Sequence, residues 1–244
     1  MTVNRNDILA QLQKEILPLQ GYKPSTDYRV PKIELGPITT AFPEARFPSG
    51  AIHEFLSIDP YCSSATSGFI AFLVAAFMQR GRASIWISPS RTLFPPALVQ
   101  YGIQPDKIIF IHLQKEADIL WVMEEALACE GIAAVVAELP GISFTASRRL
   151  QLAVEKSGVT GFIIRQNPSG RQTNACLSRW KITPLSSDPN NELPGIGFPR
   201  WKIELLKIRN GRPGAWEMEW SPAGLVPVSP QPFAIPAIVK RKTG

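Results

Sequence analysis

The chain has 244 residues, of which 45% are hydrophobic and 19% are charged, as in a globular protein of one or two domains. Its 26 basic and 20 acidic residues give a net charge of +6, which is compatible with a polyanionic partner but does not require one. Only two histidines and three widely spaced cysteines are present. This composition argues against a histidine-based catalytic triad, a metal cluster and a disulfide framework, so we expect no metal and no other cofactor.

The apolar segments are too short to predict a membrane protein. The longest apolar run, Phe69 to Met78, is about half of the roughly 20 residues that a membrane-spanning helix needs. Residues 1–17 lack the apolar region of a secretory signal. Together these features predict a cytoplasmic protein that does not associate with a membrane.

The first 48 residues are predicted to form an N-terminal helix and an extended arm. Residues 6–19 have the pattern of a short amphipathic helix, whose apolar face carries Ile8, Leu9, Leu12, Ile16 and Leu17. Prolines at positions 24, 31, 37, 43 and 48 then make the next segment too proline-rich for a helix. We therefore expect the core to begin at residue 49.

Residues 49–166 alternate between short apolar runs and helical patterns. Strands are predicted at 52–56, 83–88, 107–113, 132–139 and 160–166, and helices at 67–80, 96–101, 115–130 and 145–157. This alternation is typical of an α/β fold with a parallel central sheet covered by helices on both faces. The strands at 107–113 and 132–139 are apolar almost throughout, so we expect both in the buried centre of the sheet.

The pattern changes in the C-terminal part. Residues 176–188 and 200–220 are predicted to form antiparallel strands, with a turn at "NGRPG" (210–214). Of their tryptophans (Trp180, Trp201, Trp216 and Trp220), most are expected in the core. Five prolines follow from Ser221 onward, and the chain ends in "VKRKTG". We therefore predict a core over residues 49–221 and a proline-rich basic tail over 222–244.

Residues 50–81, "GAIHEFLSIDPYCSSATSGFIAFLVAAFMQRG", have the layout of a nucleotide-binding P-loop. A strand leads into small and polar residues and then into an apolar helix. A P-loop needs a lysine to neutralise the nucleotide phosphates, and none occurs between Ile52 and Phe77. The segment therefore has the layout of a phosphate-binding site but lacks the positive charge that would neutralise a phosphate.

The order of these elements resembles the ATPase core of the RecA recombinase family. In that family the second core strand ends in a motif with the catalytic glutamate, and the matching positions here are Ser88 and Ser90. The Walker B aspartate is replaced by Ala137, with Glu138 one residue later, and the Walker A lysine and threonine fall within 65–67. The resemblance thus implies a RecA-like core with degenerate Walker motifs, and a protein that is not an enzyme.

Three segments narrow the resemblance further: "FPSGAIHEFL" (47–56), "TASRRLQLAVEKSGVTGFIIR" (145–165) and "RWKIELLKIRNGRPGAWEMEW" (200–220). With them the chain resembles the ImuA family, RecA-related proteins of a bacterial mutagenesis cassette. The resemblance implies an SOS-induced accessory role in translesion DNA synthesis. The implied partners are an ImuB-like relative of Y-family polymerases and an error-prone C-family polymerase, with RecA, DNA and a second copy of the chain as further candidates.

Two other functions stay open from the sequence. The ImuA family is distantly related to SulA, a cell division inhibitor that binds FtsZ, although this chain is longer and carries the "NGRPG" hairpin. A recombinase-like ATPase that still binds nucleotide is the second alternative, and the absent lysine argues against it.

Basic side chains near predicted strand ends are candidates for contacts to DNA phosphates or to a partner's carboxylates. The candidates are Arg148, Arg149, Arg165, Arg171, Lys207 and Arg209. The alternative is structural: Arg148 and Arg149 would form salt bridges to Glu155 or to a nearby loop. Gln166 matches the glutamine with which RecA-type proteins sense the γ-phosphate, or is simply a polar strand end.

The tail is more apolar than a linker. Phe233, Ile235 and Ile238 lie among its prolines, a composition suited to an extended peptide. Such a peptide either docks on a partner or packs along its own domain, and the sequence leaves both interpretations open.

Overall fold

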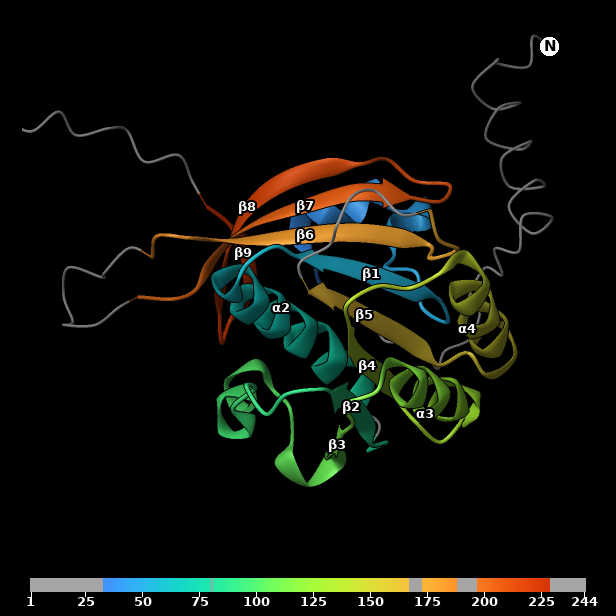
Figure 1. Cartoon of the computed structure of the whole chain (residues 1–244). Coiled ribbons are helices and arrows are strands. Elements are labelled where there is room, and N and C mark those ends of the chain that lie inside the picture. The colour runs from blue at the N-terminus through green and yellow to red at the C-terminus, as the bar shows by residue number, and fades with distance from the viewer. Residues whose placement is uncertain (1–32, 80, 167–172, 188–196, 229–244) are drawn as a thin grey trace, which may run out of the picture.

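The computed structural model describes residues 33–79, 81–166, 173–187 and 197–228, which build one mixed α/β unit around a nine-stranded sheet (Figure 1). The strands are β1 (Ile52–Ser57), β2 (Ser84–Ser88), β3 (Ile108–His112), β4 (Ala134–Leu139), β5 (Thr160–Gln166), β6 (Ser178–Leu185), β7 (Arg200–Ile208), β8 (Gly214–Ser221) and β9 (Gly224–Pro227). The helices are α2 (Pro60–Met78), α3 (Glu116–Ala128) and α4 (Phe144–Ser157). Short 3₁₀ helices are η1 (Gly36–Ala41), η2 (Pro43–Ala45), η3 (Pro95–Tyr101) and η4 (Pro105–Lys107).

The strand order is β3-β2-β4-β5-β1-β6-β7-β8-β9. All pairs from β3 to β6 are parallel, and the pairs β6–β7, β7–β8 and β8–β9 are antiparallel. The predicted α/β class, with a parallel part covered by helices and antiparallel strands toward the C-terminus, is confirmed. The turn predicted at residues 210–214 does connect β7 and β8, and Asn210 adopts a left-handed backbone with φ of 59°.

Helix α2 lies in the core on one face of the sheet. Beyond its polar first turns, residues 69–78 are apolar all round, as expected of a helix that is buried on most sides. At Gly68 an added Cβ would lie 2.7 Å from the Tyr101 hydroxyl, so glycine lets η3 pack closely over the helix. By length and hydropathy α2 could cross a membrane, but 67% of the apolar window is buried within the protein, as in an ordinary core helix.

The predicted core tryptophans pack on the α2 face. Trp180, Trp201 and Trp220 are buried, and Trp216 is partly buried against the same cluster. Trp180 stacks on Phe55 with ring planes 9° apart. The prediction that most of these aromatic rings belong to the core is confirmed.

The segment expected to be an extended arm contributes to this core as well. From residue 33 to 47 it forms η1 and η2, and it buries Leu35, Ile38 and Phe47 against α2 and the antiparallel strands. Pro37 and Pro43 occupy the first turns of these short helices, where a missing N–H is not needed. Proline thus starts two short helices where we expected none.

Two strands differ from the sequence expectation. β3 is an edge strand and not a central one, and Ile109 and Phe110 are 49% and 42% exposed. β9 forms within the segment predicted as tail, because Pro227 lies at the end of an edge strand where its missing donor is tolerated. In both cases the local sequence does not reveal how many neighbours the strand has.

His53 of β1 joins the arm to the sheet through a buried hydrogen-bond chain. Trp180 Nε1 donates to Ser178 Oγ (2.6 Å), which lies 2.6 Å from His53 Nδ1, while His53 Nε2 lies 2.8 Å from the Pro48 carbonyl. A carbonyl only accepts, so Nε2 carries a hydrogen. Burial lowers the pKa of His53 from 6.5 to about 4, so the ring is neutral at pH 7 and Ser178 then donates to Nδ1.

On the other face of β1, Glu54 forms a buried ion triad. Its Oε1 accepts from Arg165 Nη1 of β5 at 2.9 Å, and its Oε2 accepts from Arg179 Nε of β6. Glu54 is fully buried, and the side chains of Arg165 and Arg179 are 1% and 13% exposed. Because each charge is desolvated, removal of one partner leaves an uncompensated charge inside the protein.

We expect the protein to lose stability as the pH falls from 6.5 to 4. In this range unfolded chains take up a proton at His53 and folded chains do not, because the folded pKa is about 4. The difference of about 2.5 units corresponds to roughly 3 kcal/mol, present above pH 6.5 and lost by pH 4. Urea unfolding at a series of pH values should show this slope in wild type and in His112→Gln, but a reduced slope in His53→Gln.

Arg165→Met should destabilise the fold by about 3–5 kcal/mol, because it leaves Glu54 buried with a single partner. Arg148→Met is the matched control, since the Arg148 side chain is 48% exposed and its loss should cost under about 1 kcal/mol. Denaturant unfolding compares the two variants. Equal losses would show that the triad contributes no more than a surface ion pair.

Candidate functional site

The β1–α2 junction is where a P-loop would bind nucleotide, and it contains only Ile58 and Asp59. Helix α2 begins at Pro60, so the prediction of a loop up to residue 66 and a helix from 67 is wrong. Asp59 is the N-cap and Pro60 occupies the first turn, a pair that commonly starts helices. This signal was present in the sequence and could have identified the helix start.

The Asp59 carboxylate occupies the helix N-terminus, where a phosphate would lie in a P-loop. Its Oδ1 accepts from the Cys62 amide at 2.7 Å, and Pro60 has no N–H to offer. The donated hydrogen bond holds the pKa of Asp59 below its usual value, so the carboxylate is charged. An anion approaching these amides would meet a negative charge that already satisfies one of them.

The positions that match the Walker A lysine and threonine lie inside α2. Ala65 and Thr66 are 6% and 0% exposed, and Ser67 is 9% exposed. They face neighbouring core residues instead of an open loop, so they present no hydroxyl or amine to a ligand. The Thr66 hydroxyl has no hydrogen-bond partner.

The residues at the Walker B position point to opposite faces of β4. Ala137 belongs to the core cluster under α3 and α4. Glu138 faces the α2 side, where its Oε1 accepts from Trp86 Nε1 at 3.0 Å. Burial raises the pKa of Glu138, while hydrogen bonds from Trp86 and Gln166 act in the opposite direction.

Gln166 extends this chain of contacts, because its Nε2 also donates to Ser63 Oγ of α2 at 3.0 Å. The side chains of Trp86, Glu138, Gln166 and Ser63 therefore link β2, β4, β5 and α2. At the end of β2, Ser88 donates to the Ser90 carbonyl, so the positions of the family's glutamate motif carry hydroxyls that bond locally. The arrangement serves packing and holds the carboxyl ends of the strands together.

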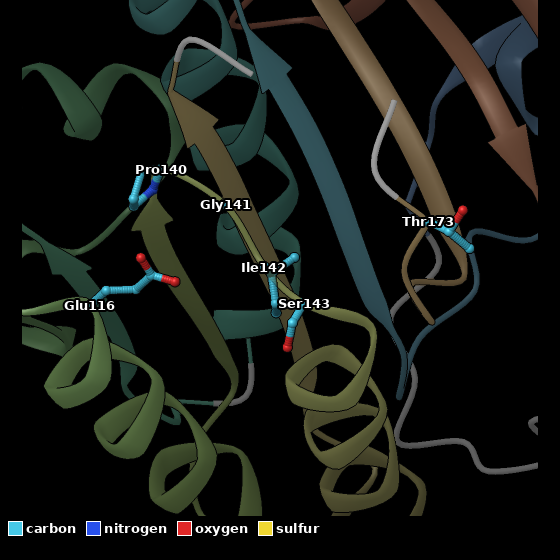
Figure 2. Close-up of a pocket in the computed structure, with 6 residues that line it drawn as sticks. All are labelled: Glu116, Pro140, Gly141, Ile142, Ser143 and Thr173. Atoms are coloured by element: carbon cyan, nitrogen blue, oxygen red, sulfur yellow. The ribbon is translucent and has the colours of Figure 1, made fainter. Parts of the chain in front are cut away.

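A shallow cavity of about 460 Å³ opens beside this edge, at the carboxyl end of β4 (Figure 2). It is lined by Glu116, Pro140, Gly141, Ile142, Ser143 and Thr173. Its charged side chain is the Glu116 carboxylate, and Ser143 Oγ already accepts from the Ala146 amide as the cap of α4. The cavity thus offers an acidic and weakly polar surface, unsuited to phosphate. No group of three or more potential metal ligands lies together in the described ranges.

Arg148 and Arg149 form the structural salt bridges that the sequence left open. Arg148 lies 3.8 Å from Glu155 of its own helix. Arg149 donates from Nε (3.2 Å) and from Nη2 to the carboxylate of Glu124 in α3. Both side chains remain largely exposed, and each lies within 4 Å of a carboxylate.

Arg165 is not the surface contact we predicted, because it is buried in the triad with Glu54. β5 is a central strand between β4 and β1, and the Arg165 side chain pairs with Glu54 of β1, which also binds Arg179 of β6. Lys207 and Arg209 are exposed at the end of β7, on a different element from Arg148. Arg171 and the tail residues Phe233, Ile235 and Ile238 lie outside the described residues, so their predicted contacts stay predictions.

No protein-family model matches the sequence. Protein ImuA of Caulobacter vibrioides (strain NA1000 / CB15N) is 34% identical over 210 residues, which cover 81% of this chain and 85% of that protein. Protein ImuA of a second strain, ATCC 19089, matches to the same extent. The cell division inhibitor SulA of Photorhabdus laumondii is 31% identical over 109 residues, or 45% of this chain and 62% of that protein.

The two ImuA matches extend across most of both chains, whereas the SulA match is partial. The resemblance predicted from three sequence segments is therefore confirmed, and the chain belongs to the ImuA family.

Proposed function

We propose that the protein is a cytoplasmic, non-catalytic accessory protein of SOS mutagenesis and translesion DNA synthesis that acts by binding an ImuB-like partner. Membership of the ImuA family supports a role in this mutagenesis process. The capped N-terminus of α2, which takes the place of a P-loop, supports a protein without catalytic activity. The observation that carries the proposal is the charged Asp59 carboxylate, which accepts a hydrogen bond from the Cys62 amide at the N-terminus of α2. A protein that keeps the fold without this site would act through its surfaces.

We further propose that the parallel part of the sheet is a RecA-like core. Support comes from the β-α order and from polar residues gathered at the carboxyl ends of β1, β4 and β5. In a P-loop ATPase, a lysine neutralises phosphate charge, and a hydroxyl and an aspartate hold Mg²⁺. Here residues 65–67 lie inside α2, and Asp59 adds a negative charge. Ala137 packs in the core under α3 and α4 and has no carboxylate to hold Mg²⁺. Each difference weakens binding of Mg²⁺–ATP.

The protein should bind ATP no more tightly than about 1 mM, or roughly −4 kcal/mol. Ligand binding raises the melting temperature in proportion to affinity, so 0.1 mM ATP with Mg²⁺ should leave it unchanged. Asp59→Asn, which removes the negative charge but adds no lysine, should behave in the same way. A clear thermal shift at tens of micromolar ATP would contradict a non-catalytic role.

The partners belong to the translesion system. An ImuB-like protein is the proposed direct partner, and an error-prone C-family polymerase, RecA and DNA are further candidates. Of the predicted contact residues, Lys207 and Arg209 are exposed, whereas Arg148 and Arg149 pair with Glu155 and Glu124. Contacts from such basic side chains to DNA phosphates would be sensitive to salt.

The proposal is tested in the native host by deleting the gene and measuring mutation frequency after ultraviolet damage. The expected result is loss of damage-induced mutagenesis, with restoration by the wild-type chain. Glu138→Gln should restore it equally, since Glu138 accepts hydrogen bonds but performs no chemistry, and its glutamine oxygen can still accept from Trp86. A tagged chain from damaged cells should capture the ImuB-like protein.

A SulA-like inhibitor of cell division is the second candidate, favoured by the partial match to SulA. It predicts that overproduction makes cells filamentous and that the tagged chain captures FtsZ. Filamentation with FtsZ capture, combined with normal mutagenesis in the deletion strain, would replace the first proposal with this one.

A further inference from the structure

Four exposed basic side chains lie around the turn between β7 and β8. Lys207, Arg209 and Arg212 belong to the end of β7 and to the turn, and Arg46 lies in the arm beside it. The backbone joins the arm to the turn, because the Arg212 amide donates to the Ala41 carbonyl at 2.9 Å. We call these four basic residues the hairpin cluster.

The cations of the hairpin cluster have no carboxylate partner. None of the four forms a salt bridge within the described residues. By contrast, the cations farther along β6 and β7 each pair with a carboxylate; they are Arg179, Lys181, Arg200 and Lys202. Residues 41–50 and 207–213 contain the four basic side chains of the cluster and one acidic side chain, Glu44, and so carry a net charge of +3. The fold thus neutralises the strand cations but leaves the charge at the turn uncompensated.

Backbone strain gathers in the same two segments. Among the described residues, the non-glycine residues with positive φ are Glu44 (56°), Ala45 (52°) and Asn210 (59°). Asparagine tolerates this region, whereas glutamate or alanine there costs roughly 1–2 kcal/mol. Such conformations cluster at ligand-binding sites, where the surrounding structure holds the chain in one shape. Here they fix the bend before Arg46 and the turn that carries Arg212.

The hairpin cluster lies at the edge of the sheet opposite to the β1–α2 junction (Figure 1). Ile208, at the end of β7, pairs with Ser178 of β6, and Ser178 pairs with His53 near the start of β1. The cluster is therefore close to the amino ends of the parallel strands, whereas Asp59 follows the carboxyl end of β1. A ligand of the cluster would bind away from the position of a nucleotide.

The chemistry of the cluster fits a phosphate backbone. Three of its four members are arginines, whose planar guanidinium groups bind phosphate oxygens through two hydrogen bonds at once. Lys207 and Arg209 are two positions apart along an extended chain, or about 6.6 Å at about 3.3 Å per residue. Successive phosphates of one DNA strand advance by about 3.4 Å along the helix axis, so these two side chains can contact separate phosphates.

A protein partner or a base-reading contact fits the cluster less well. Protein interfaces are centred on aromatic and aliphatic anchors, and single-stranded nucleic acid is often held by bases stacked on aromatic rings. In residues 41–50 and 207–213, which the structure describes in full, no large hydrophobic side chain is exposed. The cluster therefore offers charge without an apolar anchor or a stacking surface.

We propose that the hairpin cluster binds the phosphate backbone of DNA without reading its bases. The choice of DNA among polyanions rests on the proposed function in translesion DNA synthesis, and the contact itself rests on the four unpaired cations. Binding should need no nucleotide and should show no preference for sequence. It should weaken with salt, because each phosphate contact releases counterions from the DNA.

Two triple variants separate the cluster from the net charge of the protein. The first removes three cations of the hairpin cluster by Lys207→Ala, Arg209→Ala and Arg212→Ala. The matched control removes the same charge beside β2 and β3, at the far end of the strand order, by Arg91→Ala, Lys107→Ala and Lys115→Ala. Fluorescence anisotropy measures binding to a labelled DNA duplex and to a labelled single strand between about 50 and 200 mM salt. Circular dichroism checks folding.

Each phosphate contact adds about 0.9 to the slope of log affinity against log salt concentration for duplex DNA. Loss of three contacts should therefore reduce the magnitude of this slope by about 2.7, whereas the control variant should keep the wild-type slope. If the hairpin variant does not fold, Arg212→Glu should still reduce the slope by about 1. The backbone N–H of residue 212 keeps its bond to the Ala41 carbonyl in that variant.

Equal reductions in the two triple variants would show that binding follows net charge alone, and would overturn the proposal. A wild-type protein that does not bind DNA at about 50 mM salt, or that prefers one sequence or single strands, would overturn it as well. The measurement uses purified protein and free DNA. Its failure would therefore leave the capture of an ImuB-like partner and the mutagenesis test unaffected.

Discussion

The Glu54 carboxylate joins the two halves of the sheet, and the rest of the structure depends on it. β1 lies between the parallel strand β5 and the first strand of the antiparallel part, β6, and Glu54 binds an arginine from each. Without the carboxylate, two cations would lie close together in a poorly solvated site. On the opposite face of the same strand, His53 joins the arm through Pro48. β1 is thus held by a buried ion triad on one face and by hydrogen bonds between uncharged groups on the other.

At the end of this strand, the element order of a P-loop is present without an open loop. With Asp59 as its cap, α2 begins directly after β1 and leaves no loop to surround a phosphate. The same helix N-terminus that attracts anions in other proteins is here satisfied by the chain's own carboxylate.

Sequence patterns determined most of the fold. Alternating apolar runs and helical periods located every strand of the parallel part, and the turn residues Asn210 and Gly211 located the hairpin between β7 and β8. Three quoted segments were enough to identify the family, which the ImuA matches confirm. These features are local, because backbone preferences and side-chain periodicity act over a few residues. The Asp59–Pro60 helix start was equally local but was obscured by the resemblance to a P-loop.

Only the tertiary structure decided what depends on neighbours distant in sequence. An apolar strand predicts burial, yet β3 lies at the edge, because its sequence does not specify how many strands flank it. An arginine predicts exposure, yet Arg165 is buried, because Glu54 lies 111 residues away in the chain and beside it in space. Burial, ion pairing and the charge state of His53 are properties of packed environments. The sequence by itself determined the elements and the family, and long-range packing determined which side chains remain available to a partner.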